Sequence, residues 1–249
     1  MNPHFFSRPD LQDLLARSRP QRLALGDLYS RLPATRCRRR ARCCSLLPET
    51  SLPEALAALA ALQRFPPARR LSIQKRVVRY FLINPLEITS CPFLEGGGCL
   101  IYADRFFGCR AYGLWSPEEY ARRAKADRPA KKMMGEQWLR LGVRLPVTVI
   151  DFQVPYCRQV FPALPVSDQV LGEIEEGLEL LARDLNPWTA RFQELYFSDL
   201  SFLIAGLIFG VPAALRLKFT LVKERLQTGR RDRLDEVLLN LEGRADILS

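Results

Sequence analysis

Histidine is almost absent from this chain. His4 is the only one among 249 residues, and it lies far along the sequence from every cysteine. No Ser-His-Asp or Cys-His catalytic arrangement can be built from a single histidine near the terminus. Any metal site has to use mostly cysteine, with Asp or Glu as additional ligands. If the protein is an enzyme, its chemistry is expected to belong to a metal centre.

Several motifs that carry a known chemistry are also missing. The chain has no G-x-G-x-x-G, and residues 96–98 (GGG) lack the Lys-Ser/Thr of a phosphate-binding loop. We interpret the three glycines as a flexible turn. The absence of any C-x2-C pair excludes the zinc-ribbon and simple ferredoxin patterns. No DNA-binding motif is recognisable, and the arginine-rich stretch lacks the interleaved aromatic residues of a single-strand-binding groove.

Long apolar runs are scarce. The first residues, MNPHFFSRPDLQD, contain no apolar run typical of a signal peptide, and we expect a cytoplasmic protein. Ser201, Pro212 and Arg216 interrupt the apolar run of residues 200–217. This run falls short of the about 20 apolar residues that span a membrane. We interpret it as a buried core helix and expect no transmembrane segment.

Acidic residues are scarce in the first part of the chain. Residues 1–150 carry 26 Lys and Arg against 12 Asp and Glu, whereas residues 151–249 carry 11 against 15. One interpretation is an anionic partner, which would be a charged ligand, an acidic protein or, less favoured, nucleic acid. The other, which we prefer, is a solvated surface with a basic shell that compensates a negatively charged thiolate–metal centre.

Helical patterns account for most of the remaining sequence. The capping box Ser51-Leu-Pro-Glu54 predicts a helix to about residue 65, and residues 68–83 predict a second that completes a helical hairpin. Further helices are predicted at residues 9–19, at 116–141 with a break at Pro129, at 167–185, from residue 187 to about residue 210, and in later segments. Residues 147–152 (VTVIDF) are the only predicted strand. The fold class is therefore expected to be mainly α.

Three regions follow from this distribution of elements. Residues 1–35 are predicted to form an N-terminal helical segment, residues 36–115 a cysteine-cluster metal-binding region, and residues 116–249 a helical C-terminal region. The metal-binding core is expected to be rich in cysteine and dominated by loops.

Cysteine is concentrated in two stretches. We call residues 37–44 (CRRRARCC) the first cysteine island and residues 91–115 (CPFLEGGGCLIYADRFFGCRAYGLW) the second. In a reducing compartment cysteines are more often metal ligands or catalytic groups than disulfides. Thiolates suit tetrahedral zinc or the irons of an iron–sulfur cluster. We therefore predict a cysteine-ligated site that holds an iron–sulfur cluster, with zinc as the alternative. Its candidate ligands are Cys37, Cys43, Cys44, Cys91, Cys99, Cys109 and Cys157.

Two of these ligands need separate comment. Adjacent Cys43 and Cys44 are expected to point in different directions, so that one binds the metal while the other packs or serves a second metal. Cys157 lies alone in the loop VPYCRQVFPALP. It is interpreted either as a small buried hydrophobic residue or as an additional ligand.

Charged and aromatic residues surround Cys109 in the sequence. Arg105 and Arg110 flank it, and a cation close to a thiolate lowers its pKa. The same arginines are also suited to clamping a carboxylate or phosphate, or to a surface ion pair with Asp104. Tyr102, together with Tyr112 and Trp115, is expected to cover the site and limit solvent. A stacking surface for a nucleotide-like ligand is the alternative.

The two islands carry a resemblance to a known family. They are similar to the YkgJ-like cysteine-cluster family, whose members are described as zinc- or iron-chelating. Its first motif, C-x2-C-x2-C-C, is matched at Cys37, Cys43 and Cys44, with Arg40 in place of the second cysteine. Phe106 stands where a proline is usual in the second motif. The resemblance covers about residues 36–115, and its second motif is matched at Cys91, Pro92, Phe93, Leu94, Cys99, Ile101, Tyr102, Arg105, Cys109, Arg110 and Tyr112.

The resemblance implies metal binding through an iron–sulfur cluster or zinc. The flagellin lysine N-methylases have a similar cysteine cluster and are associated with methyl transfer from S-adenosylmethionine. A protein lysine N-methylase-like enzyme that uses S-adenosylmethionine is therefore one alternative function. A structural zinc module that presents a basic surface to nucleic acid is another. Because Arg40 replaces one cysteine of the family motif, Cys157 is the candidate for the missing ligand.

Overall fold

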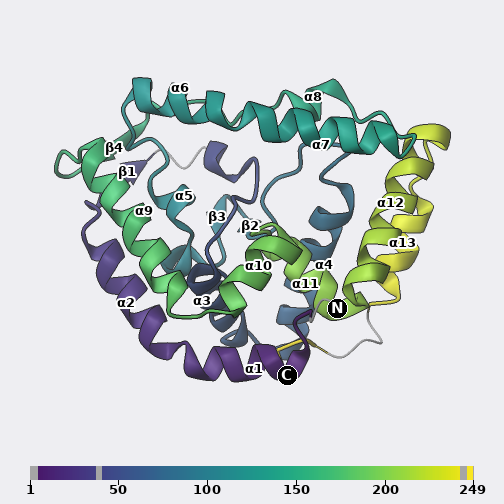
Figure 1. Cartoon of the computed structure of the whole chain (residues 1–249), viewed down its shortest axis with the longest axis horizontal. Helices are drawn as coiled ribbons and strands as arrows, with labels where there is room; N and C mark the ends of the chain where they lie inside the picture. The colour runs from purple at the N-terminus through teal and green to yellow at the C-terminus, as the bar shows by residue number, and fades with distance from the viewer. Residues whose placement is uncertain (1–4, 38–40, 242–245, 249) are drawn as a thin grey trace.

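The fold is mainly helical, as the sequence predicts. The computed structural model describes residues 5–37, 41–241 and 246–248 (Figure 1). Two short 3-10 helices are η1 (Arg42–Cys44) and η2 (Tyr102–Asp104), and the strands are β1 (Thr35–Cys37), β2 (Leu94–Glu95), β3 (Gly98–Cys99) and β4 (Val160–Pro162). The α-helices are α1 (Arg8–Arg17), α2 (Arg19–Ser30), α3 (Leu52–Gln63), α4 (Pro67–Ile83), α5 (Phe107–Arg110), α6 (Pro117–Ala126), α7 (Arg128–Arg140), α8 (Val147–Ile150), α9 (Asp168–Arg183), α10 (Trp188–Tyr196), α11 (Leu200–Phe209), α12 (Val211–Thr228) and α13 (Asp232–Leu239).

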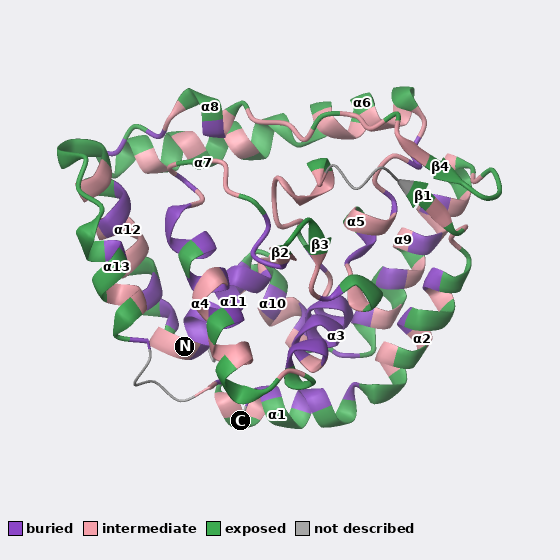
Figure 2. Ribbon diagram, turned by 180° about the vertical axis from the view of Figure 1, so that it is seen from behind, coloured by how far each residue is buried: buried purple, intermediate pink, exposed green. Residues whose placement is uncertain are grey.

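Two apolar helices form the centre of the molecule. α3 is buried at ten of its twelve positions and α11 at eight of its ten. A helix that is apolar on all sides has to be enclosed by other elements, and Figure 2 shows these two helices inside the ring of surrounding ones. α11 packs against α4, where the rings of Phe81 and Phe202 stack with their centroids 5.1 Å apart. The largest core cluster also contains Phe6 and Ile247, from the two ends of the chain.

A buried carboxylate, Glu54, connects three segments at the start of α3. It is 3% exposed. The carboxylate accepts hydrogen bonds from the N–H of Ser51 at 2.9 Å, as in the predicted capping box, and from the hydroxyl of Tyr29 at 2.5 Å. It also accepts one from the N–H of Phe107 at 2.6 Å. Glu54 therefore holds α2, α3 and the beginning of α5 together.

The predicted strand at residues 147–152 is wrong. Val147–Ile150 form the short helix α8 after Pro146, and the N–H of Asp151 bonds to the carbonyl of Val147 at 2.8 Å. The β-branched residues favour a strand, but the backbone groups of this segment are paired within its own turn, and Val149 is buried there. The strands lie elsewhere, as two antiparallel pairs that join β1 to β4 and β2 to β3.

Two helix boundaries also differ from expectation. Residues 19–30, which show no clear pattern in the sequence, form α2, whose buried Leu25 and Tyr29 face α3 and α9. The helix expected from residue 187 to about residue 210 is divided into α10 and α11. Phe197 and Ser198, both with a positive φ, separate the two helices. A non-glycine residue in this conformation ends a helix.

Helices α6 and α7 run along one edge of the molecule (Figure 1). Neither contains a buried residue, and the break between them falls near Pro129, as predicted. Side-chain contacts attach them to the rest. Trp138 stacks on Phe219 of α12 with centroids 5.8 Å apart, and Arg123 pairs with Glu175 of α9 at 2.6 Å. The hydroxyl of Tyr120 also donates to the carbonyl of Val154 at 2.6 Å. These helices are therefore attached by aromatic, ionic and hydrogen-bonded contacts without a fully buried residue of their own.

The apolar run of residues 200–217 is divided between two helices. Gly210, with φ of 78°, separates α11 from α12. In the described part of the chain no single helix is long and apolar enough to cross a membrane. α10 and α11 pass that test only as a pair, and they meet at an angle of 90°. The interpretation of residues 200–217 as one buried core helix holds for residues 200–209, which form the buried α11, whereas residues 211–217 begin the less buried α12.

Loss of the Glu54 carboxylate should destabilise the fold strongly. Glu54→Ala leaves the buried donors of Tyr29 and Phe107 without an acceptor, so we expect a loss of about 3 kcal/mol or more in the free energy of unfolding. Glu54→Gln keeps one acceptor and should lose less. Urea unfolding measures both variants, with the exposed Glu118→Ala as the matched control, which should change stability by less than about 0.5 kcal/mol. Equal stability of Glu54→Ala and Glu118→Ala would contradict the role of Glu54.

Lys218 of α12 should make stability depend on pH. Its ammonium group lies 4.3 Å from the centroid of the buried Phe81 ring, and burial lowers the pKa of Lys218 to about 8. An unfolded lysine has a pKa of about 10.4, so between about pH 8 and 10.4 the unfolded chain binds more protons and stability rises with pH. Lys218→Met removes this charge.

Lys218→Met should therefore be more stable than the wild-type chain at about pH 7, by on the order of 1 kcal/mol. The difference should shrink towards about pH 10, because the native lysine is then neutral as well. Urea unfolding of both proteins over this range gives the comparison, in which the titration of all other groups cancels. A stability difference that stays constant with pH would show that Lys218 is not desolvated.

Candidate metal centre

The backbones of the two cysteine islands are in direct contact. The N–H of Cys91 donates to the carbonyl of Cys44 at 2.7 Å. The N–H of Leu47, just after the first island, donates to the hydroxyl of Tyr80 on α4 at 3.0 Å. The hairpin of α3 and α4, predicted from the sequence, thus returns the chain to the segment from which it started.

The thiols of Cys43 and Cys44 lie side by side on η1, with their Sγ atoms 3.8 Å apart. The expectation that they point in different directions is therefore wrong. In the 3-10 turn of η1 the two neighbouring side chains lie close enough for their sulfur atoms to meet. Two thiolates bound to one tetrahedral ion at about 2.3 Å would also lie about 3.8 Å apart.

The second island begins with a tight hairpin. β2 and β3 pair across Gly96 and Gly97, whose φ values of 55° and 78° are those of a two-residue turn that favours glycine. The prediction of a turn at the three glycines is confirmed. The hairpin places Cys99 opposite Leu94, and the N–H of Leu100 bonds back to the carbonyl of Phe93 at 2.8 Å.

Five thiols of the two islands influence one another electrostatically. Charge on Cys43 raises the pKa of Cys44, Cys91, Cys99 and Cys109. Burial is the larger cause for the last three, and it raises the pKa of Cys91 to about 12. Cys43 differs, because a hydrogen bond from the thiol of Cys44 lowers its pKa to about 7. These five thiols therefore form one cluster in which Cys43 ionises most readily.

Arg105 is the cation that acts on most of this cluster. Its charge lowers the pKa of Cys43, Cys99 and Cys109, although burial outweighs it at the last two, and Arg76 acts in the same way on Cys91. The Nε atom of Arg105 is buried and has no hydrogen-bond partner among the described residues. Its guanidinium group lies 4.1 Å from the centroid of the Tyr102 ring. In the described part of the chain, Arg105 thus acts on the thiols without an ion-pair partner of its own.

Arg110 stabilises the backbone next to the thiol cluster. Its side chain donates to the carbonyl of Arg105 at 2.9 Å and lies 4.4 Å from the centroid of the Tyr29 ring. Asp104, the expected ion-pair partner of these arginines, pairs with Arg64 of α3's C-terminal end instead. Arg110 therefore fixes the loop that carries Arg105.

The aromatic residues divide between surface and core. Tyr102 is 56% exposed and supports Arg105, so it does not enclose the thiols. Trp115 is 7% exposed and packs edge-on against Phe107 in a second core cluster with α2 and α9. Tyr112 is half-buried and donates its hydroxyl to the carbonyl of Pro155 at 2.6 Å. Tyr102, Tyr112 and Trp115 therefore contact three different parts of the structure, and their role as a common cover stays a prediction.

Cys157 lies at the margin of the cluster. Its charge raises the pKa of Tyr112 and Tyr120, and it is not among the charges that shift the pKa of the five clustered thiols. A Cβ atom at Gly113 would lie 3.1 Å from the carbonyl oxygen of Cys157. The loop around Cys157 therefore contacts the end of the second island at residues 112–113, beside the thiol cluster.

Part of the first island lies outside the described residues. The structure gives the backbone of Cys37, which pairs with Val160 across β1 and β4. Arg40, at the position where the family motif has a cysteine, is outside the described range, as is His4. The pairing of β1 with β4 nevertheless brings the chain just after Cys157 next to the start of the first island.

Within the described residues, no group of three or more Cys, His, Asp or Glu side chains has the geometry to hold a metal ion. Only Cys43 and Cys44 have sulfur atoms within hydrogen-bonding distance among the described thiols. The donor set has the soft chemistry that zinc and iron–sulfur clusters require. Cys91, Cys99 and Cys109 would have to move closer to the Cys43–Cys44 pair for all these thiols to bind one ion.

Glu54 also supports this site, although the sequence predicts only that it caps a helix. The capping box explains Glu54 as a helix cap, but its bond to Phe107 anchors the segment that carries Cys109. The signal in the sequence is an acidic residue in a helix that is otherwise entirely Leu, Ala and Pro up to Gln63. When such a helix is buried, the carboxylate needs hydrogen-bond donors from other parts of the protein.

The thiols of the metal-free protein should differ in reactivity. Because a thiolate is the nucleophile, iodoacetamide at neutral pH should modify Cys43 well before Cys91 and Cys109, whose ionisation burial opposes. Peptide mapping by mass spectrometry after short reaction times gives the order. The urea-unfolded chain, in which all thiols should react alike, is the control. Modification of Cys91 as fast as Cys43 in the folded protein would contradict the arrangement.

Comparison of this chain with protein-family models, curated proteins and solved structures found no match. The resemblance to the YkgJ-like family rests on the cysteine motifs alone and stays a prediction. The assignment of this site therefore depends on the chemistry and positions of its own residues.

Proposed function

We propose that the two cysteine islands bind a metal centre, which is an iron–sulfur cluster in preference to zinc. The observation that carries this proposal is that thiols from separate segments lie near one another. The Sγ atoms of Cys43 and Cys44 are 3.8 Å apart, the N–H of Cys91 bonds to the carbonyl of Cys44, and the charge of Cys43 adds to the effect of burial on the pKa of Cys99 and Cys109. Thiols used only as small hydrophobic residues have no need to face a cation. This cluster faces Arg105, whose Nε lacks a hydrogen-bond partner among the described residues.

The energetics of ionisation support a metal rather than free thiolates. Burial raises the pKa of Cys91, Cys99 and Cys109, so the folded chain alone keeps them protonated. A metal cation replaces those protons, since the thiolate is the form that binds. Arg105 would then offset part of the negative charge that four thiolates contribute. The basic excess of residues 1–150 acts in the same direction.

The positions of the sulfurs favour a cluster over a single ion. Four ligands of one zinc ion have to meet at about 2.3 Å from one point. The cysteines of an iron–sulfur cluster bind different irons and are therefore spread more widely. Charge on Cys91 and Cys109 raises the pKa of Cys44, and charge on Cys43 raises that of Cys99. In the part of the chain described, none of these three thiols comes within hydrogen-bonding distance of the vicinal pair.

Backbone amides would tune such a centre. The N–H of Phe93 bonds to the sulfur of Cys91, and the N–H of Ile101 bonds to that of Cys99. Hydrogen bonds to the sulfur ligands are one of the factors that set the reduction potential of a cluster. The hairpin β2–β3 holds both amides, so its geometry would affect the properties of the metal centre.

Metal content and thiol substitutions test this proposal. Protein purified without oxygen should be brown and contain iron and acid-labile sulfide, and elemental analysis distinguishes this result from bound zinc. Cys91→Ser and Cys109→Ser should each lose most of the metal, because each removes a thiol of the cluster. Cys157→Ser is the matched control and should keep the wild-type metal content, since Cys157 lies beside the cluster.

Two results would decide against the proposal. Protein that holds neither iron nor zinc, both as purified and after reconstitution with iron and sulfide or with zinc, would exclude a metal centre. Loss of metal from Cys157→Ser, with retention in Cys109→Ser, would move the site away from the thiol cluster described above. Thermal unfolding of each variant in the metal-free state separates loss of metal from loss of fold.

A further inference from the structure

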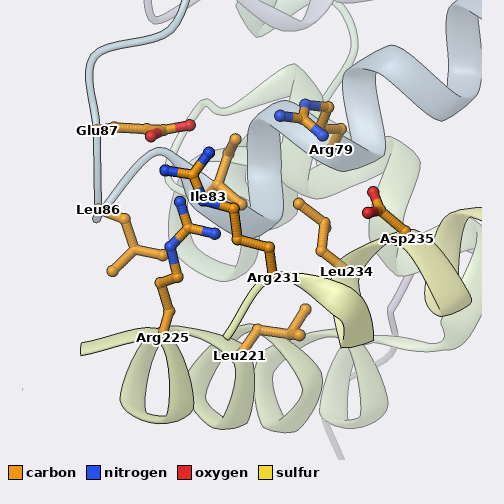
Figure 3. Close-up of a pocket in the computed structure, with 9 residues that line it drawn as sticks. All are labelled: Arg79, Ile83, Leu86, Glu87, Leu221, Arg225, Arg231, Leu234 and Asp235. Carbon is orange, nitrogen blue, oxygen red and sulfur yellow. The ribbon is translucent and has the colours of Figure 1, made fainter. Parts of the chain in front are cut away.

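A cavity of about 230 Å³ lies away from the cysteine islands, between α4, α12 and α13. Figure 3 shows the side chains that line it. Each of the three elements contributes one arginine and one apolar residue close to it in the sequence. These pairs are Arg79 with Ile83 at the end of α4, Leu221 with Arg225 in α12, and Arg231 with Leu234 at the start of α13.

The apolar members form the floor of the cavity. Ile83, Leu221 and Leu234 are 5%, 6% and 8% exposed, and all three belong to the largest core cluster. Arg79 and Arg231 are exposed, and Arg225 is half-buried. The i, i+4 spacing of the first two pairs places both members on the same helix face. Arg231 is the residue just before α13, three positions ahead of Leu234. The result is an apolar base with guanidinium groups at its rim.

The rim of the cavity carries more positive than negative charge. Three arginines and two carboxylates, Glu87 and Asp235, line the cavity. Among the described residues none of these five groups forms an ion pair with another within the usual 4 Å, and in Figure 3 the guanidinium groups of Arg225 and Arg231 project towards the same part of the cavity. Two like charges that face a common space repel one another, and an anion placed between them removes that repulsion.

We propose that this cavity binds a small organic oxyanion, with a phosphate or carboxylate head and a short apolar stem. Arg225 and Arg231 bind the head, because a planar guanidinium donates two parallel hydrogen bonds to a carboxylate or phosphate. The stem lies on Ile83, Leu221 and Leu234. The cavity is smaller than the about 300 Å³ at which drug-sized ligand sites begin, which limits the ligand to a short stem.

Four probes separate the contributions of head and stem. Isothermal titration calorimetry at about 0.15 M salt, where loose surface attraction is screened, compares hexyl phosphate, hexanoate, inorganic phosphate and hexanol. We expect saturable binding of hexyl phosphate, hexanoate or both, at least about tenfold tighter than that of inorganic phosphate. Hexanol, which lacks the charge, should not bind. Whichever of the two anions binds more tightly identifies the preferred head.

Substitutions of neighbouring arginines provide matched variants. Arg231→Gln and Arg225→Gln should each weaken binding of the tighter probe at least about tenfold, as expected for a hydrogen bond to a charged group. Arg230→Gln removes the same charge from an exposed position that does not line the cavity, and it should change the affinity less than about twofold. Unchanged thermal unfolding shows that each variant is folded.

The proposal is wrong if neither organic anion binds saturably, or if Arg230→Gln weakens binding as much as Arg231→Gln does. The second result would indicate attraction to the general positive charge of the surface. The metal content of the three variants should equal that of the wild-type protein, because none of the three residues contacts the cysteine islands. Failure of this proposal therefore leaves the metal-centre proposal intact.

Discussion

The buried carboxylate of Glu54 is the interaction on which the arrangement of the cysteine islands depends. A carboxylate taken out of water has to be compensated by donors, and here the donors come from Ser51, Tyr29 and Phe107, in three different segments. The same bonds that stabilise the charge therefore fix the second island against α2 and α3. Because Phe107 lies two residues before Cys109, the position of that thiol is tied to the helical core.

Ionised thiols in the cluster would likewise need compensating positive charge, and the chain supplies only part of it. Burial and mutual repulsion oppose ionisation of Cys91, Cys99 and Cys109, against which Arg76 acts on Cys91 and Arg105 on the other two. A metal centre would complete the compensation from outside the chain. The cavity between α4, α12 and α13 carries an excess of positive charge, with three arginines against two acidic residues. The proposals for both places follow from the charges that surround them.

The helical scaffold separates these two regions. α4 takes part in both, since Tyr80 holds the segment after the first island and Arg79, one residue earlier, lines the cavity. Successive residues on a helix point about 100° apart, so one helix can present different faces to two sites. The rest of each region comes from different parts of the chain, namely the loops around η1 and the β2–β3 hairpin for the thiols, and α12 with α13 for the cavity.

Local patterns in the sequence determined the mainly helical fold, the capping box at Ser51, the turn at Gly96 and Gly97 and the concentration of cysteine in two islands. Each of these depends on residues within a few positions of one another. The sequence also predicted a strand at residues 147–152 and a divergent Cys43–Cys44 pair, and both were wrong because local turn geometry outweighed residue preference. Only the tertiary structure decided which distant groups meet: Glu54 with Phe107, Arg105 with the thiols, and the three arginines of the cavity. Such contacts depend on how helices pack against one another, which no local spacing of residues encodes.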